Sequence, residues 1–260
     1  ERDVKKTGLP PGLSGKRVII QGLGNVGYHA ALFLSQHDGC RITHVLEREG
    51  SIVDPGGVDI AALHEHMIET GDIQDYPGFT ESGPEMLEAE ADILIPAAME
   101  GVINQHNAPR IRTPLIIEAA NGPVTAPGDA ALRGRGIVII PDFCANAGGV
   151  TVSYFEWIKN LTHIRFGRIQ RRQLENQFEA LIAGVESITG TPFPAAHRNE
   201  VLSGATEINL VRSGLEDTMR GAYNAISATW NETDNVPDLR TAAMMIAVDR
   251  VAQSYISIGI

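Results

Sequence analysis

Short runs of β-branched and aliphatic residues recur between helical stretches along the first 140 residues of the chain. Glycine, proline or charged residues bound these runs, which lie at residues 18–20, 42–46, 93–95, 115–117 and 137–140. Nearly continuous apolar strands that alternate with helices are typical of a parallel sheet covered on both faces. We therefore predict an α/β fold with a doubly wound, mostly parallel sheet.

A glycine-rich turn, Gly22-Leu23-Gly24-Asn25-Val26-Gly27, directly follows the first run. Gly22 permits a tight turn, Gly24 lets a pyrophosphate approach the backbone, and Gly27 lets the next helix lie close to the sheet. That helix, expected over residues 25–36, offers N–H groups and the positive end of its dipole to phosphates. The pattern predicts a Rossmann-like dinucleotide site; a structural turn without a ligand is the alternative.

Glu47 ends the second run, 20 residues after Gly27. A dinucleotide-binding fold places an acidic residue here to accept hydrogen bonds from the adenosine ribose hydroxyls. A carboxylate repels a 2′-phosphate, which favours NAD, whereas the neighbouring Arg48 could pair with that phosphate and allow NADP. We expect NAD as the cofactor, with NADP as the alternative.

Three further segments, residues 96–98, 120–123 and 141–149, follow predicted strands. Ligands of open α/β sheets bind at this edge, where the carboxyl ends of the strands meet. Asn121 and Asn146 each offer a donor and an acceptor, which suits the carboxamide of a nicotinamide. Taken singly, each asparagine is equally typical of a turn.

The segments GLGNVG, ADILIPAA, EAANGPVT, IPDFCANAGGVTVSYFEW and DLRTAA together resemble the C-terminal, coenzyme-binding half of the glutamate dehydrogenases. These enzymes form part of the wider glutamate/leucine/phenylalanine/valine dehydrogenase family. The resemblance covers nearly the whole chain, and NAGGVTVSYFEW is its most specific segment. It implies the reversible oxidative deamination of L-glutamate to 2-oxoglutarate and ammonia, with hydride transfer to NAD(P).

The resemblance also implies individual roles. It assigns residues 22–26 to the pyrophosphate, Glu47 to the adenosine ribose, Ala97 and Ala98 to the nicotinamide ribose, and Asn121 and Asn146 to the nicotinamide. It implies that Ser153 contacts a substrate carboxylate; without the surrounding motif, Ser153 would be interpreted as a helix serine bonded to its own backbone. In the family the catalytic lysine and its partner aspartate lie in a glycine-rich N-terminal segment that does not occur here. We expect no catalytic residue and no metal ligand in this chain.

The same resemblance implies that the chain is divided into four parts. Residues 1–13 would be a linker from an N-terminal substrate domain, and residues 14–165 the dinucleotide-binding domain. Residues 166–204 would form a helical, antenna-like insert, shorter than the antenna of animal glutamate dehydrogenases. Residues 205–260 would form the pivot and C-terminal helices, which we expect as two helices separated at residues 235–237.

Composition limits the expected partners and compartment. The formal net charge of −11 would repel phosphate backbones, so we expect no nucleic acid partner. No stretch approaches the roughly 20 apolar residues that a membrane helix requires. Cys40 and Cys144 offer no disulfide framework, which indicates the cytoplasm. The expected partners are the small-molecule substrate, L-glutamate or 2-oxoglutarate, and copies of the same chain, as a hexamer in the full-length enzyme.

Two other functions remain open. The chain could be a free-standing dinucleotide-binding sensor without catalysis, or an oligomerisation module built mainly from the helices of residues 150–260. The charged start, which lacks an initiating methionine, indicates a piece of a longer protein. A substrate domain encoded upstream of Glu1 would exclude the sensor.

Overall fold

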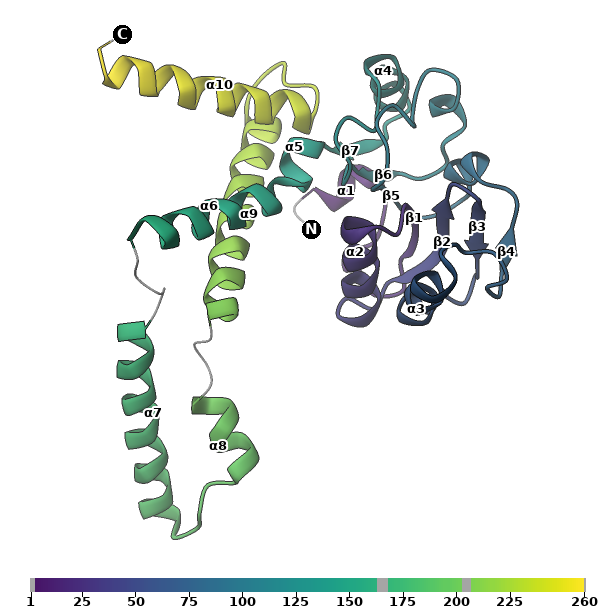
Figure 1. Cartoon of the computed structure of the whole chain (residues 1–260). Helices are drawn as coiled ribbons and strands as arrows, with labels where there is room; N and C mark the ends of the chain where they lie inside the picture. Colours follow the sequence, from purple (N-terminus) through teal and green to yellow (C-terminus); the bar gives the residue numbers. More distant parts are fainter. Residues whose placement is uncertain (1–2, 163–167, 203–206, 260) are drawn as a thin grey trace. The chain divides into compact units, whose positions relative to one another are not determined.

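The computed structural model describes residues 3–162, 168–202 and 207–259. The chain divides into two compact units, one formed by Glu1–Asn146 with Tyr223–Ile260 and the other by Ala147–Ala222. The first unit contains the sheet, and the second contains helices (Figure 1). Within the described ranges, no helix is both long and apolar enough to cross a membrane.

A seven-stranded sheet in the order β4-β3-β2-β1-β5-β6-β7 forms the centre of the first unit. Its strands are β1 (Arg17–Gln21), β2 (Arg41–Glu47), β3 (Gly50–Val53), β4 (Phe79–Thr80), β5 (Ile93–Pro96), β6 (Leu115–Ile117) and β7 (Val138–Ile140). The strands from β2 to β7 in this order are parallel, which confirms the predicted α/β fold. Along the chain, β2, β3 and β4 add to one side of β1, and β5, β6 and β7 then add to its other side. This reversal makes β1 and β5 the pair beside which such sheets bind ligands.

The edge formed by β3 and β4 was not predicted. β3 pairs antiparallel with β2, and β4 pairs antiparallel with β3. Arg48 and Glu49 connect β2 to β3, and this pair lacks the Asn-Gly or Asp-Gly sequence that marks a tight hairpin. β4 has only two residues, too few to show a periodic pattern. The apolar runs therefore predicted the parallel part of the sheet and missed its antiparallel edge.

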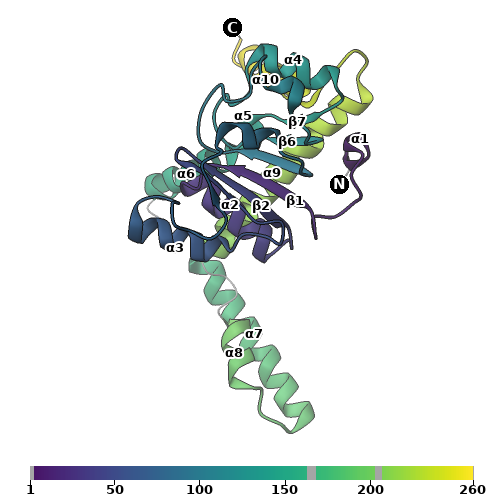
Figure 2. The ribbon, with the colours of Figure 1, turned by 90° about the vertical axis from the view of Figure 1, so that its right-hand side faces the viewer.

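Helices cover both faces of the sheet. They are α2 (Asn25–Gln36), α3 (Ile60–Thr70), η1 (Pro84–Glu88), η2 (Ala108–Arg110) and α4 (Ala126–Gly134). Val18 and Ile20 of β1 pack in one cluster with α2 and α3, whereas Ile19 packs in a second cluster with η1, η2 and α4. Figures 1 and 2 show α2 and α3 on one side of the sheet and α4 on the other. Burial on both faces explains why β1 is apolar throughout its centre.

The C-terminal helices add a third cluster beside β7. They are α9 (Glu207–Glu232), whose last part belongs to this unit, and α10 (Leu239–Ser257). Ile226 and Leu239 pack there with Val138 and Ile140. Asn235 has a φ of 63° between the two helices, and the predicted separation at residues 235–237 is confirmed.

The predicted linker contains a short helix, α1 (Val4–Thr7), that is attached to the first unit. The carboxylate of Asp3 accepts hydrogen bonds from the hydroxyl of Tyr223 at 2.9 Å and from the amide of Asn231 at 2.8 Å. Both partners lie on α9. These contacts connect the start of the described chain to residues more than two hundred positions later.

The second unit contains α6 (Ala147–Thr162), α7 (Arg168–Thr189), α8 (Ala195–Leu202) and the first part of α9. α7 and α8 are helices within the range predicted for the helical insert. α8 itself was not predicted. The predicted limits of the insert, between 165 and 166 and between 204 and 205, lie outside the described residues. The division into linker, dinucleotide domain, insert and C-terminal helices stays a prediction.

Candidate functional site

The glycine loop between β1 and α2 leaves no room for a side chain at two of its glycines. Gly22 has a φ of 87°, and a Cβ there would lie 2.6 Å from the Cβ of Ala98. A Cβ on Gly27 would lie 1.8 Å from the carbonyl oxygen of Gly22. Both glycines are therefore required by packing: Gly22 for the turn and Gly27 for the close approach of α2 to the sheet.

The start of α2 is open. Gly24 is the N-cap residue, no side chain caps the helix, and a Cβ on Gly24 would meet no atom within 4 Å. The first N–H groups of a helix have no partner within the helix and carry the positive end of its dipole. Asn25 and Val26 of this first turn are exposed. This arrangement fits a pyrophosphate at the predicted residues 22–26.

Glu47 lies at the end of β2, beside the glycine loop. Its carboxylate accepts a hydrogen bond from the backbone N–H of Leu23. Burial raises the pKa of the Glu47 carboxyl group, and the hydrogen bond from Leu23 partly opposes this shift. The location agrees with the predicted role at the adenosine ribose, which stays a prediction.

A cavity of about 330 Å³ opens beside Glu47. Leu46, Leu87 and Val102 supply apolar surface to it. Gln21 also lines the cavity, and its Oε1 atom is buried without a hydrogen-bonding partner in the part of the chain that the structure describes. Apolar walls with a few polar atoms are typical of small-molecule and cofactor sites.

Arg48, the residue that could allow NADP, extends into solvent. Its side chain is 92% exposed and forms an ion pair of 2.8 Å with the carboxylate of Glu49. A 2′-phosphate would have to compete with Glu49 for this guanidinium group. Exposed ion pairs are weak, so the geometry leaves both cofactors possible while Glu47 favours NAD.

Ala97 and Ala98 follow β5 at the same edge of the sheet. The N–H of Ala97 donates to the carbonyl of Gln21 at 2.8 Å, and the side chain of Ala98 lies against Gly22. Larger side chains here would displace the glycine loop. Packing against the glycine loop therefore requires small residues here, and the role of the two alanines at the nicotinamide ribose stays a prediction.

Asn121 and Asn146 come together in space. The Nδ2 of Asn146 donates a hydrogen bond of 2.6 Å to the Oδ1 of Asn121, although 25 residues separate them. Asn121 follows β6, and Asn146 ends α5 (Asp142–Ala145), a one-turn helix after β7 that was not predicted. Both segments lie at the carboxyl edge of the parallel strands. The pair presents two carboxamides at one place, which suits the predicted nicotinamide contact.

Three charged residues behind the asparagines were not selected from the sequence. Glu118 follows β6 and its side chain is fully buried, with one carboxylate oxygen 2.7 Å from the guanidinium of Arg240 on α10. Arg240 also lies 3.3 Å from the carboxylate of Asp142. The sequence signal that could have found Glu118 and Asp142 is an acidic residue within two positions of the end of a predicted strand. Arg240 belongs to the segment DLRTAA, which is one of the segments that support the resemblance, but the resemblance assigned no role to this residue.

Ser153 lies on α6, in the second unit, whereas the other predicted site residues lie in the first unit. Its hydroxyl donates to the carbonyl oxygen of Gly149 at 3.0 Å. This is the arrangement expected of a helix serine bonded to its own backbone. The side chain is exposed, so the hydroxyl remains accessible to a carboxylate. Its role in substrate binding stays a prediction.

The sequence model of the Glutamate/Leucine/Phenylalanine/Valine dehydrogenase family matches residues 3–190. The chain belongs to this family. The match includes the glycine loop, Glu47, the asparagine pair and Ser153.

Relatives within the family are glutamate dehydrogenases by name. A probable glutamate dehydrogenase of Sinorhizobium fredii is 47% identical over 250 residues, covering 93% of this chain and 56% of the relative. The mitochondrial glutamate dehydrogenase of Dictyostelium discoideum is 45% identical over 261 residues, covering 100% of this chain and 51% of the relative. The chain thus spans about half the length of these curated relatives.

A solved structure has the same fold. The hetero-hexameric glutamate dehydrogenase of Thermus thermophilus, in its leucine-bound form, matches with a TM-score of 0.74 at 24% identity. The match covers 99% of this chain and 50% of that one. The described architecture is therefore that of one half of a family member.

Proposed function

We propose that this chain is the coenzyme-binding half of a glutamate dehydrogenase, which reversibly deaminates L-glutamate to 2-oxoglutarate and ammonia. The observation that carries the proposal is the meeting of Asn121 and Asn146 at the sheet edge that also holds the glycine loop. A dinucleotide needs both a pyrophosphate cradle and a separate place for its nicotinamide ring. The names of the relatives favour an enzyme over a free-standing sensor or an oligomerisation module.

Each part of the proposed site has a separate task. The open start of α2 binds the pyrophosphate, Glu47 and its cavity bind the adenosine, and the asparagine pair holds the nicotinamide carboxamide. When bound, NAD(P) supplies the acceptor for a hydride from the substrate α-carbon. The chain itself binds and orients this acceptor, and the residues that move protons belong to the substrate half of such an enzyme.

The coenzyme assignment is tested by replacing Glu47. We expect Glu47→Ser to lower the ratio of NADH affinity to NADPH affinity by about tenfold, since a hydrogen bond to a charged group contributes about 1.5–3 kcal/mol. Loss of the negative charge also removes repulsion of a 2′-phosphate. Fluorescence titration of the 260-residue chain with both cofactors measures the ratio.

The matched control is Glu49→Ser, which removes a carboxylate from the same turn. This variant should keep the NADH affinity of the wild-type chain, and its NADPH affinity should rise, because the loss of Glu49 frees Arg48 for a 2′-phosphate. A fall in NADH affinity is therefore expected only for Glu47→Ser. An unchanged affinity ratio in Glu47→Ser would exclude Glu47 as the ribose ligand.

The substrate assignment is tested at Ser153, in an enzyme assembled from this chain and a glutamate dehydrogenase substrate domain. We expect Ser153→Ala to raise KM for glutamate about tenfold or more, because one hydrogen bond to a carboxylate is lost. Steady-state kinetics at saturating coenzyme measure this change. Thr151→Val removes another hydroxyl that is bonded to the backbone of the same helix, and should leave KM unchanged. An unaltered KM in Ser153→Ala would refute the assignment.

We further propose that the chain acts in the cytoplasm, on small molecules, and assembles with other copies into a hexamer. The hexameric Thermus structure supports assembly, although that enzyme contains unlike chains. The Dictyostelium relative is mitochondrial by name, so fractionation of the source cells tests the compartment.

A further inference from the structure

Arg240, near the start of α10, binds acidic groups on three different elements. Its guanidinium lies 2.7 Å from the carboxylate of Glu118, 3.3 Å from that of Asp142 and 3.6 Å from that of Asp129. The side chain of Glu118 is fully buried, and a buried carboxylate requires a compensating charge. Arg240 supplies that charge from a position 122 residues later in the chain.

The same carboxylates hold the backbone that carries the asparagine pair. Glu118 accepts a hydrogen bond of 2.8 Å from the N–H of Asp142. Asp142 in turn accepts one of 2.8 Å from the N–H of Gly122, next to Asn121. The N–H of Asn146 donates to the carbonyl oxygen of Asp142 at 2.8 Å. Asp142 is therefore a common anchor for both asparagine segments.

We propose that Arg240 is a positioning residue for the nicotinamide site, acting through Glu118 and Asp142 on the Asn121–Asn146 pair. This inference rests on the proposed coenzyme-binding function. Without the guanidinium, Glu118 loses the counter-charge described above, and the carboxylate of Asp142 loses one of the three hydrogen bonds that it accepts. The loop after β6 and the helix α5 are then held together less firmly, so the side-chain amides of Asn121 and Asn146 lose their alignment.

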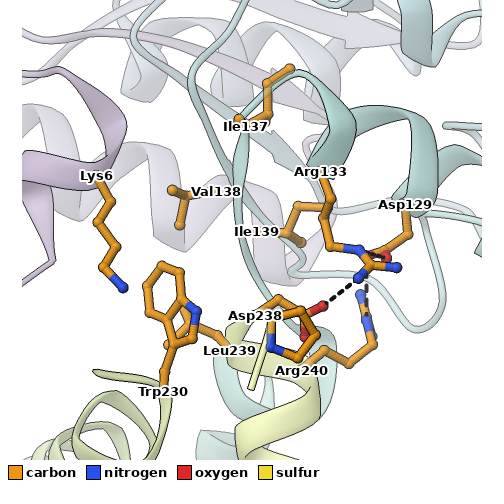
Figure 3. A pocket seen from close by; sticks show the side chains of 12 residues that line it. Lys6, Asp129, Arg133, Ile137, Val138, Ile139, Trp230, Asp238, Leu239 and Arg240 are labelled. Carbon is orange, nitrogen blue, oxygen red and sulfur yellow. Dashed lines mark hydrogen bonds and ion pairs between the residues drawn. The ribbon is translucent and has the colours of Figure 1, made fainter. Parts of the chain in front are cut away.

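Arg133 provides a matched control in the same region. It joins Asp129 of α4, at 2.7 Å, to Asp238, the N-cap residue of α10, at 2.8 Å. Arg133 and Arg240 therefore both contact Asp129 (Figure 3). Among the residues that the structure describes, Arg133 pairs with Asp129 and Asp238 and with neither Glu118 nor Asp142. Its loss should therefore weaken the attachment of α10 without disturbing the asparagine pair.

The experiment compares two ligands of the 260-residue chain. NADH and ADP-ribose share the adenosine, the pyrophosphate and the second ribose, but only NADH carries a nicotinamide ring. We expect Arg240→Met to weaken NADH binding about tenfold and to leave ADP-ribose binding within about twofold, a difference that a general loss of stability cannot produce. Arg133→Met should leave the ratio of the two affinities unchanged. Arg240→Lys should restore part of the ratio, because it returns the positive charge to Glu118.

The two ligands distinguish failure of the inference from failure of the proposed function. Equal weakening of NADH and ADP-ribose in Arg240→Met would show a structural role alone and overturn the inference, while the proposed function would stand. If Arg240→Met does not fold, the double variant Glu118→Gln/Arg240→Met removes the unpaired charge, and the same ratio is measured there and in Arg240→Lys. A wild-type chain that binds neither ligand would overturn the proposed function, and the inference with it.

Discussion

Gly27→Ala is expected to lower the free energy of unfolding by about 3 kcal/mol, at the upper end of the usual cost of overpacking. The added Cβ would lie 1.8 Å from the carbonyl oxygen of Gly22, so backbone rather than a flexible side chain must move. α2 would then shift away from the glycine loop, and its open N–H groups would no longer face a pyrophosphate. We expect NADH binding to fall about tenfold or more in the same variant. Denaturant unfolding and NADH titration measure the two effects.

Gly134→Ala is the control for this substitution. Gly134 ends α4, and a Cβ there would meet no atom within 4 Å. Its replacement should change stability by about 0.5 kcal/mol or less. Wild-type stability in Gly27→Ala would contradict the described packing of α2 against the loop.

The 260-residue chain alone is expected to bind NADH saturably but to produce no NADH from glutamate and NAD above a control without protein. The sheet and the phosphate loop belong to one compact unit, which should bind a dinucleotide without a partner domain. Catalysis also needs a substrate held against the coenzyme, and correct positioning accounts for about 7–11 kcal/mol of barrier reduction. The resemblance assigns the catalytic lysine and aspartate to a segment absent from this sequence.

Absorbance at the NADH band and NADH fluorescence test the two halves of this prediction separately. Glutamate-dependent turnover by the chain alone would show that the catalytic base lies within it. A complete absence of NADH binding would refute the assignment of the glycine loop, on which the adenosine and nicotinamide assignments depend.

The central sheet and its first helix were predictable because their signals are local. The helix expected over residues 25–36 is α2 with these same bounds, since the glycine loop marks its start and apolar spacing marks its length. The five parallel strands were predictable because strands buried on both faces must be apolar throughout. β3 and β4 were missed because their pairing depends on the neighbouring strand more than on their own few residues.

The binding site was predictable only in part. Gly22, Gly27 and Glu47 follow from spacing, because the loop and the acid occupy fixed positions along a β-α-β unit. The role of each asparagine was open, and only the folded chain places the two carboxamides within hydrogen-bonding distance. The structure does not decide between the two interpretations of Ser153. Its hydroxyl is bonded to its own helix, and its role in substrate binding is still only implied by the resemblance.

Residue type and local spacing thus determined which groups this protein has for binding a dinucleotide, and on which elements they lie. The tertiary structure alone decided that Arg240 of the last helix neutralises Glu118 behind the asparagine pair. The physical reason is that a backbone conformation depends on neighbouring residues, whereas the partner of a buried charge depends on which distant segments pack together. Nothing in the sequence around Glu118 indicates a partner 122 residues away.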